Sequence, residues 1–573
     1  MRKNLSRLLA GALACISVLG LVGCGGNPYS DLDDGGNKRP EKVLDPSKTQ
    51  LQVVTFRAGF GDEWLYELED RFEEAYKDVV YEDGKKGVQV WHEGDTKQYD
   101  AQAVISSKYD IFFMEGGDYY ALCANGGALE ELTDIVTLPN KDDNDKTIFS
   151  KMTAQQKSFY GYTAVDGDPK YYAIPHYEGG WGLVYNKELF DRKGYYLASK
   201  AGEDPCLISS PEATSEKGTG PDGQTGTEDD GLPRTYEEFF FLCDEIVARD
   251  DTPFCWSGKH AEPYLTTMMN TLVADYNGVE QMTLNLDFNG TAQELVVMED
   301  NEVVWENGKI KTETKEITPA NGYDMARQVA KYYAIEFLYK MLTEKGYYND
   351  GAFVSTHDHL MAQTDFLQAG TTFASGKGEM AMLVDGPWWE GEATTTFNTM
   401  SAQNDAYSKK NRNFGWMPLP KATEEKVGSG KVYVDSLSAF TVVKAGLGPK
   451  KQAALDFVRF SATEASLVEF TQITGALKSY NYTLNEEQSA NLSPFTKSLI
   501  RYKETATLYV HDSSSAFFQK NRTSLQPYRA YGSSDGDGTV GNPVIAFSKK
   551  KHISAEDYFV NMCKRWKSDN MFQ

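Results

Sequence analysis

Strand-like and helix-like hydrophobic patterns alternate along the first part of the chain. The β-rich run 51–56 precedes apolar residues at helical spacing between Trp64 and Tyr76, and the same order returns at 88–107 and at 109–125. Repeated strand–helix units predict an α/β fold with a largely parallel sheet covered by helices. Ligands of such sheets bind beyond the carboxyl ends of strands, so the loops 57–63 and 114–118 are candidate binding loops.

A second series of the same kind follows and predicts a second α/β lobe. It contains a probable hairpin around Asp300-Asn301 and a Gly/Ser/Asp/Thr-rich insertion at 202–232. The other predicted elements are strands at 171–175, 182–186, 379–384, 414–417 and 437–443, and helices near 235–248, 262–275, 325–343, 450–461, 464–474 and 555–566.

The N-terminus has the pattern of an export signal. Positive residues at 2, 3 and 7 precede the apolar run 8–23, which is too short to span a bilayer comfortably. The run ends in Leu21-Val22-Gly23-Cys24, which resembles the bacterial lipobox, in which the cysteine is acylated after cleavage; the alternative is an ordinary signal with a chance cysteine. We therefore expect a lipoprotein signal peptide at 1–23, a flexible tether at 24–48, and a protein anchored through Cys24 to the outer face of the cell membrane.

Composition removes several other classes of protein. The chain of 573 residues has 58 Lys+Arg against 83 Asp+Glu, a formal net charge of −25, which argues against nucleic-acid binding. A mean hydropathy of −0.50 and one long apolar run exclude a polytopic membrane protein. Besides Cys15 in the signal and Cys24, five cysteines remain without a C-x-x-C pair, which indicates neither a disulfide framework nor a zinc site; they are Cys123, Cys206, Cys243, Cys255 and Cys563.

Several segments together resemble one family. They are Phe72-Glu-Glu-Ala-Tyr76, the strand 109–113 with Gly126-Gly-Ala-Leu129, the segments 172–175 and 182–190, the helix start 233–239, and, most strongly, the segment 373–388 that ends in Asp-Gly-Pro-Trp. In this order they resemble extracellular solute-binding protein family 1, the carbohydrate-binding lipoproteins of ATP-driven (ABC) importers, the group that contains maltose-binding protein.

The resemblance implies a two-lobed periplasmic-binding-protein-like fold of type II, each lobe a mostly parallel sheet flanked by helices, with hinge crossings near 172–178 and 433–438. It places 49–176 and 435–503 in the first lobe and 177–434 and 504–573 in the second. It further implies a monomeric receptor that captures a carbohydrate, most simply an oligosaccharide, between the lobes and delivers it to the permease subunits of an ABC importer. On this interpretation the protein is not an enzyme and requires no cofactor.

A sugar ring needs flat aromatic platforms together with carboxylates and amides that accept hydrogen bonds. Trp388 and Trp389 directly follow Asp385-Gly386-Pro387 at a predicted strand end, and the resemblance makes Trp388 the stacking residue. Packing in the core is the alternative for both tryptophans.

Other candidates lie at the predicted strand ends and hinges. The ligand-binding candidates besides Trp388, Trp389 and Asp385 are Phe60, Asp62, Trp64, Glu115, Asp118, Glu178, Trp181, Tyr433 and Asp435. Asp62 and Asp118 could equally cap helices, and for Tyr433 and Asp435 packing is an equal alternative. Trp256 and Tyr264 adjoin the same region without a specific motif.

Other chemistry is less well supported by the sequence. The acidic loop 221–231 could hold calcium through Asp222, Asp229 and Asp230, although it departs from the EF-hand spacing, and a solvated acidic loop is the alternative. His357 and His359 lack a third ligand motif for a metal. A receptor for peptides or another small solute is the alternative function, and no spacing singles out the carboxyl pair of a secreted glycoside hydrolase.

Overall fold

The computed structural model describes residues 42–572 except 117, 125, 164–167, 200–204, 212, 215, 375–377, 535–539 and 549–552. The predicted signal peptide, Cys24 and most of the predicted tether lie outside the described residues. Within them, no helix combines the length and the apolar character needed to cross a membrane.

The first sheet has five strands in the order β2-β1-β3-β18-β6. They are β1 (Thr49–Phe56), β2 (Val88–Asp95), β3 (Ile111–Met114), β6 (Ala173–Pro175) and β18 (Phe440–Val443). β1 runs parallel to β2 and β3, and β18 runs antiparallel to both β3 and β6. β3 and β18 are buried along their whole length, which explains their continuous apolar sequences.

The second sheet has four strands in the order β16-β7-β15-β8. They are β7 (Gly182–Asn186), β8 (Thr252–Cys255), β15 (Met380–Asp385) and β16 (Phe414–Trp416). β7 runs antiparallel to β15 and β16, whereas β15 and β8 are parallel.

Each sheet thus has one antiparallel strand, and that strand follows a crossing from the other lobe. β7 begins directly after the crossing 176–181, and β18 begins after the crossing 436–439. The predicted α/β fold with two lobes, mostly parallel sheets and hinge crossovers is confirmed.

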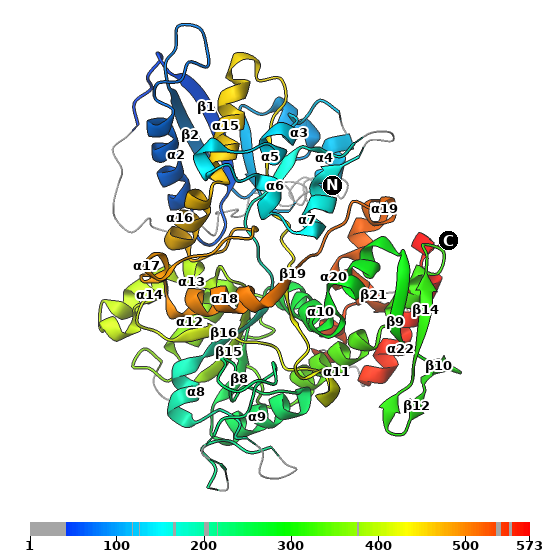
Figure 1. Cartoon of the computed structure of the whole chain (residues 1–573). Coiled ribbons are helices and arrows are strands. Elements are labelled where there is room, and N and C mark those ends of the chain that lie inside the picture. Colours follow the sequence, from blue (N-terminus) through cyan, green and yellow to red (C-terminus); the bar gives the residue numbers. More distant parts are fainter. Residues whose placement is uncertain are drawn as a thin grey trace, which may run out of the picture. The chain divides into compact units, whose positions relative to one another are not determined.

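Helices cover the first sheet and close its core. α2 (Glu63–Ala75) packs against α16 (Glu464–Thr474), and α15 (Lys451–Ser461) packs against β1 and β18 (Figure 1). The apolar side of α2 is buried at Leu65, Leu68 and Phe72, the helical spacing seen in the sequence. The shorter helices of this lobe are α3 (Ala101–Ser106), α4 (Tyr119–Ala124), α5 (Thr133–Thr137), α6 (Ile148–Lys151) and α7 (Ala154–Tyr160).

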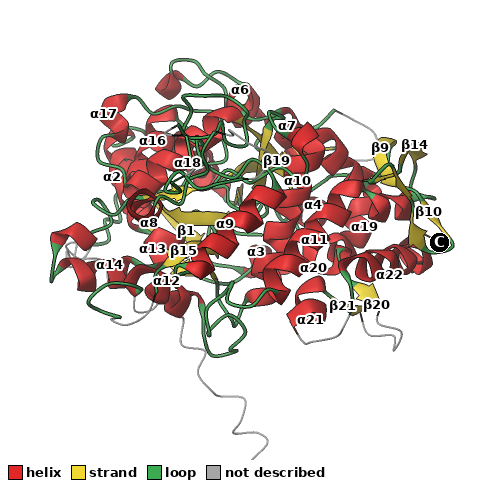
Figure 2. Ribbon diagram, turned by 90° about the horizontal axis from the view of Figure 1, so that it is seen from below, coloured by secondary structure: helices red, strands yellow, loops and turns green. Residues whose placement is uncertain are grey.

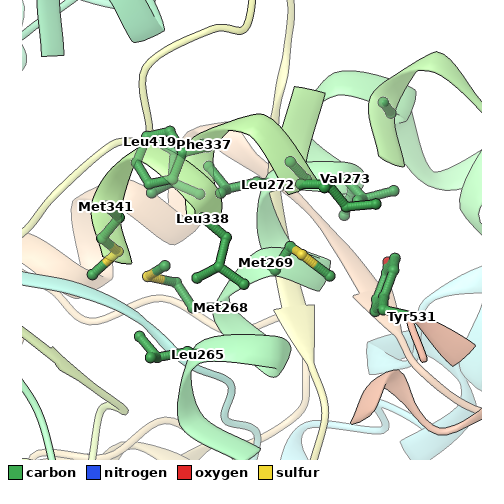
Figure 3. Close-up of a cluster of buried hydrophobic side chains, with 14 of the residues drawn as sticks. Leu265, Met268, Met269, Leu272, Val273, Phe337, Leu338, Met341, Leu419 and Tyr531 are labelled. Carbon is green, nitrogen blue, oxygen red and sulfur yellow. The ribbon is translucent and has the colours of Figure 1, made fainter. Parts of the chain in front are cut away.

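The second lobe is built around the long helix α10 (Ala261–Asp287), which packs against α11 (Val329–Thr343). Met268, Met269 and Leu338 meet in this contact (Figure 3). α9 (Tyr236–Ala248) begins where Thr235 accepts a hydrogen bond from the amide of Glu238. The other helices of this region are α8 (Lys187–Lys193), α12 (His359–Gln368), α13 (Trp389–Glu392), α14 (Thr394–Ser401) and α18 (Pro494–Thr505). In Figure 2, β1 and β15 lie among helices.

The hairpin predicted at Asp300-Asn301 is confirmed. β10 (Met298–Glu299) and β11 (Glu302–Val303) pair antiparallel, and both turn residues have positive φ, as a type I′ turn requires. It belongs to a group of short strands: β9 (Gly290–Val296), β12 (Trp305–Glu306), β13 (Lys309–Ile310) and β14 (Thr312–Ile317) (Figure 1).

The segment after residue 503, which matched no sequence pattern, adds a strand to the hinge. β19 (Ala506–Val510) pairs in parallel with β17 (Lys431–Asp435), so that Asp435 lies opposite Val510. Gln155 of α7 then binds Val510 through both of its amide atoms, at 2.6 Å and 2.8 Å. The chain continues as α19 (Ala516–Leu525), α20 (Pro527–Ala530), α21 (Pro543–Ser548) and α22 (Ala555–Ser568), and these helices pack on α10 and α11.

The lobe boundaries drawn from the sequence stay predictions. α18 packs against β16 of the second sheet, although the sequence boundary assigned residues up to 503 to the first lobe. The chain therefore crosses between the sheets once more, after α16, through residues 475–493 and the short helix α17 (Glu486–Ser489).

Candidate functional site

The first hinge crossing carries a side chain that packs on the loops of the first lobe. The hydroxyl of Tyr177 donates a hydrogen bond to Glu115 beyond β3, and the Tyr177 ring lies edge-on to Phe60, with centroids 4.9 Å apart. The hinge therefore brings together Phe60 and Glu115 from the two loops that follow β1 and β3, as the rule for strand ends predicts.

Asp435 fixes the second crossing. Its Oδ1 accepts hydrogen bonds from the amides of Gly179 at 3.3 Å, Leu437 at 3.2 Å and Ser438 at 3.2 Å. One carboxylate thus ties together the two crossings that a hinge motion would bend.

Carboxyl groups gather at this hinge. Glu178 is fully buried, and Lys503 Nζ lies 2.6 Å from its Oε1. Burial, then the charge of Glu178, raises the pKa of Asp435 to about 7, and burial, then the charge of Asp435, raises the pKa of Glu115 to about 8. Near neutral pH these two groups hold protons for part of the time, so each can donate as well as accept a hydrogen bond.

Trp388 is placed by the turn that follows β15. Its ring packs over Gly386 and comes so close to Gly179 that a Cβ there would lie 2.8 Å from the indole. Trp181 lies edge-on to it at 5.0 Å, and Tyr264 of α10 lies 5.5 Å from Trp181. An aromatic surface therefore extends from the half-buried Trp388 and Trp181 at the hinge to the buried Tyr264 of α10.

Asp385, just before this turn, is held by side chains that the sequence did not single out. Gln363 of α12 donates to Asp385 Oδ2 at 3.0 Å and to Glu392 Oε2 at 2.6 Å. Burial raises the pKa of Asp385 to about 7. No motif marks Gln363 or Glu392, because their proximity to Asp385 comes from tertiary packing.

The two lobes touch where two glycines meet. A Cβ on Gly391 of α13 would lie 2.7 Å from the carbonyl oxygen of Gly59, and a Cβ on Gly59 would collide with Glu392. Glycine at both positions therefore permits a close approach of the loop after β1 to α13.

Other candidates lie away from this aromatic surface. Trp389 has no exposed area and packs against Phe366, Phe397, Phe414 and Phe495, and Trp64 lies in the first core, 5.2 Å from Phe113. These positions agree with the alternative of core packing.

Four more candidates have local partners. Tyr433 is buried 6.3 Å from Tyr502, and Trp256 donates to the carbonyl oxygen of Ala352. Asp118 is exposed and accepts from the amide of Ala121, as a cap would, whereas Asp62 makes an ion pair with Arg57 at 2.7 Å and no cap bond.

The acidic loop has a protein counter-ion. Lys431 Nζ lies 3.3 Å from Asp229 and 3.9 Å from Asp222, and Asp230 accepts from the amide of Gly226. The described residues contain no group of three or more His, Cys, Asp or Glu arranged to hold a metal ion. This geometry favours the ammonium group of Lys431 over calcium. The five cysteines of the described residues are free thiols.

Comparison with known proteins decides the family. The sequence profile described as "Bacterial extracellular solute-binding protein" matches residues 57–467, most of the chain and both lobes. The chain belongs to this family. A search of curated proteins found no match.

Solved structures share the fold of this solute-binding protein. One, from work on xylan utilization by the thermophilic bacterium Caldanaerobius polysaccharolyticus, has a TM-score of 0.54 at 15% identity, with 90% of this chain and 99% of that chain covered. A chitin oligosaccharide binding protein has a TM-score of 0.49 at 16% identity, covering 91% and 98%. RafE in complex with raffinose has a TM-score of 0.48 at 13% identity, covering 90% and 98%. At this identity, the likeness to the structure from the work on xylan utilization supports the two-lobed fold alone. The family match indicates an extracellular solute-binding protein.

Proposed function

We propose that this solute-binding protein captures an oligosaccharide between its lobes and delivers it to the permease of an ATP-driven importer. The observation that carries the proposal is the aromatic surface of Trp388, Trp181 and Tyr264 next to the carboxyl group of Asp385. Aromatic rings stack on the apolar faces of sugars, and carboxyl and amide groups bind their hydroxyls. The solved structure from work on xylan utilization agrees with this choice of ligand.

Binding rather than hydrolysis suits the carboxyl groups at the hinge. Glu178 is paired with Lys503, and Asp435 is engaged by three backbone amides, so both already have structural partners. A glycoside hydrolase needs one carboxyl group to protonate the leaving oxygen and another to attack or activate water. The protein acts as a monomeric receptor without a required cofactor.

Anchoring through Cys24 completes the proposal. A lipobox in front of Cys24 would leave an acylated cysteine as the first residue and keep the receptor at the outer face of the cell membrane, near its permease. Mass spectrometry of the protein purified from membranes should find a diacylated or triacylated Cys24. An N-terminus cleaved elsewhere, with an unmodified cysteine, would overturn this part.

Closure of the two lobes on a bound sugar tests the proposed receptor function. The chain from residue 48 onward is titrated calorimetrically with α- and β-linked oligosaccharides, and small-angle scattering is recorded with and without each sugar that binds. We expect saturable binding with one class of linkage and a smaller radius of gyration in the complex, because a ligand that contacts both lobes favours the closed state. Binding without compaction would contradict capture between the lobes, and binding of peptides alone would favour the alternative receptor.

A further inference from the structure

A cavity with a volume of about 940 Å³ lies on the second lobe. It runs along α11, between the start of α9 and the start of α22, and the hairpin of β12 and β13 contributes Trp305 to it. It shares no lining residue with the surface around Trp388. This volume lies in the range of sites that hold small organic ligands.

Trp305 is the unusual residue of this cavity. It is 49% exposed, whereas the other eight tryptophans, all of them in the described part of the chain, are buried or half-buried. Its ring lies 6.2 Å from that of Tyr332, edge-on. Exposing an indole to water is unfavourable, so its placement over a cavity already lined by aromatic rings indicates a surface that is covered when a ligand binds.

The remaining aromatic lining forms a continuous floor. Tyr236 packs edge-on to Phe337 at 4.8 Å, and Phe240 lies 4.9 Å from the same ring. Tyr333 and Tyr339, which are half-buried, extend this floor along α11 with hydroxyl groups. The cavity therefore offers apolar faces and polar edges together.

The charges on the lining define the class of ligand. Among the described lining residues, acidic side chains outnumber basic ones: Glu237, Glu336, Glu344, Glu556 and Asp557 line the cavity together with Lys340. Lys340 in turn lies over the ring of Phe240, 4.8 Å from its centroid. Phosphorylated or otherwise anionic ligands would be repelled, whereas a neutral sugar offers hydroxyl donors to carboxylates and C–H faces to aromatic rings.

We infer that this cavity, which we call the Trp305 groove, is a second carbohydrate-binding site that holds a neutral glycan chain outside the interlobe site. Trp305 supplies the stacking surface above the buried ring of Tyr332, and Glu336 and Glu556 accept hydrogen bonds from the hydroxyl groups. The groove would keep a polymer close to the receptor while the interlobe site takes up shorter pieces. This inference does not depend on the ligand of the interlobe site.

Affinity electrophoresis tests the groove directly. The chain from residue 48 onward is run in native gels that contain soluble arabinoxylan, galactomannan, mixed-linkage β-glucan or starch. The variants are Trp305→Ala, Trp305→Phe, Trp388→Ala for the interlobe site, and Tyr528→Ala as a matched control, because Tyr528 is an aromatic residue 42% exposed away from the groove. Circular dichroism and melting confirm that each variant folds.

At least one polysaccharide should retard the wild-type protein. Trp305→Ala should weaken this retardation at least 10-fold, Trp305→Phe should restore part of it, and Trp388→Ala and Tyr528→Ala should behave like the wild type. Free mobility of the wild type in all four gels, or retardation lost in Trp388→Ala and kept in Trp305→Ala, would overturn the inference. Failure of the interlobe proposal gives a different result. Trp305→Ala keeps the interlobe site intact, so if this variant binds no oligosaccharide, the interlobe proposal is wrong and not the groove.

Discussion

Replacing Lys503 by methionine should destabilise the hinge in a way that depends on pH. The Lys503 ammonium lies 2.6 Å from Glu178, which has no exposed area, and it also donates to the carbonyl oxygens of Lys478 at 3.2 Å and Tyr480 at 3.3 Å. Lys503→Met leaves a buried carboxylate without its counter-ion, which typically costs about 3–5 kcal/mol. We expect the lower end, because the Lys503 side chain retains some exposure.

The sign of the pH dependence follows from burial. Burial raises the pKa of Glu178 in the folded protein, although Lys503 opposes it, and loss of Lys503 raises that pKa further. A carboxyl group whose pKa is higher in the folded than in the unfolded protein contributes fully to stability when the pH is below its unfolded pKa. This contribution is lost as the pH rises to the folded pKa. The variant should therefore lose more stability at pH 8 than at pH 5.

Urea denaturation at both pH values measures this effect in wild type, Lys503→Met, and the double variant Lys503→Met with Glu178→Gln. The double variant should recover most of the loss at pH 8, because no buried charge remains. Lys497→Met is the matched control, since Lys497 lies on the same helix and donates to the carbonyl oxygen of Ala490. An equal loss at both pH values without recovery by Glu178→Gln would refute the reasoning.

Four further predictions follow from named contacts. Trp388→Ala should weaken oligosaccharide binding at least 10-fold in calorimetry, because ring stacking adds on the order of 1 kcal/mol to burial, and unchanged affinity would make its role structural. The pKa of Asp435 is raised to about 7, so its contribution to the free energy of unfolding is full below the unfolded pKa and is lost as the pH rises. The stability of wild type relative to Asp435→Asn should therefore fall by up to about 2 kcal/mol between pH 5 and pH 7 in urea denaturation. A constant difference would argue against a titrating Asp435. Gln155→Ala should speed hydrogen exchange of the amide of Val510, whose hydrogen bond it removes, and unaltered protection would show that this link does not hold β19. Calcium should give no heat and no change in melting temperature, because the Lys431 ammonium already serves Asp229 and Asp222 as a counter-ion; binding that chelators reverse would restore the calcium site.

Much of the fold could be predicted from the sequence because it rests on local patterns. The helical spacing after Trp64 and the turn at Asp300-Asn301 each specify their own element, and the structure confirms both. The role of β19 could not be found in this way. The strand Ala506–Val510 can be recognised only through its pairing with β17, 75 residues earlier in the chain, and strand pairing of this kind leaves no periodic signal.

The candidate site likewise contains residues that local patterns could locate and residues that only tertiary packing brings to the site. The turn before Trp388 and the ends of β1 and β3 could be located, because proline, glycine and strand ends position side chains in a recognisable way. The resemblance singled out Trp388 for stacking, but the local pattern could not show that Trp389 lies in the core, since adjacent residues share most local features and differ in the side of the turn that meets the core. Gln363 and Lys503 escaped notice because each meets its carboxyl partner only through tertiary packing.

The central claim is that a sugar lies against the aromatic surface between the lobes, and tryptophan fluorescence reports on it most directly. The chain from residue 48 onward is titrated with α- and β-linked oligosaccharides while the total tryptophan emission is followed, to which Trp181 and Trp388, 5.0 Å apart in the site, contribute. We predict a saturable change with one linkage class that Trp388→Ala abolishes and Trp305→Ala retains. A folded protein whose emission stays constant with every sugar, or changes equally in Trp388→Ala, would contradict the account.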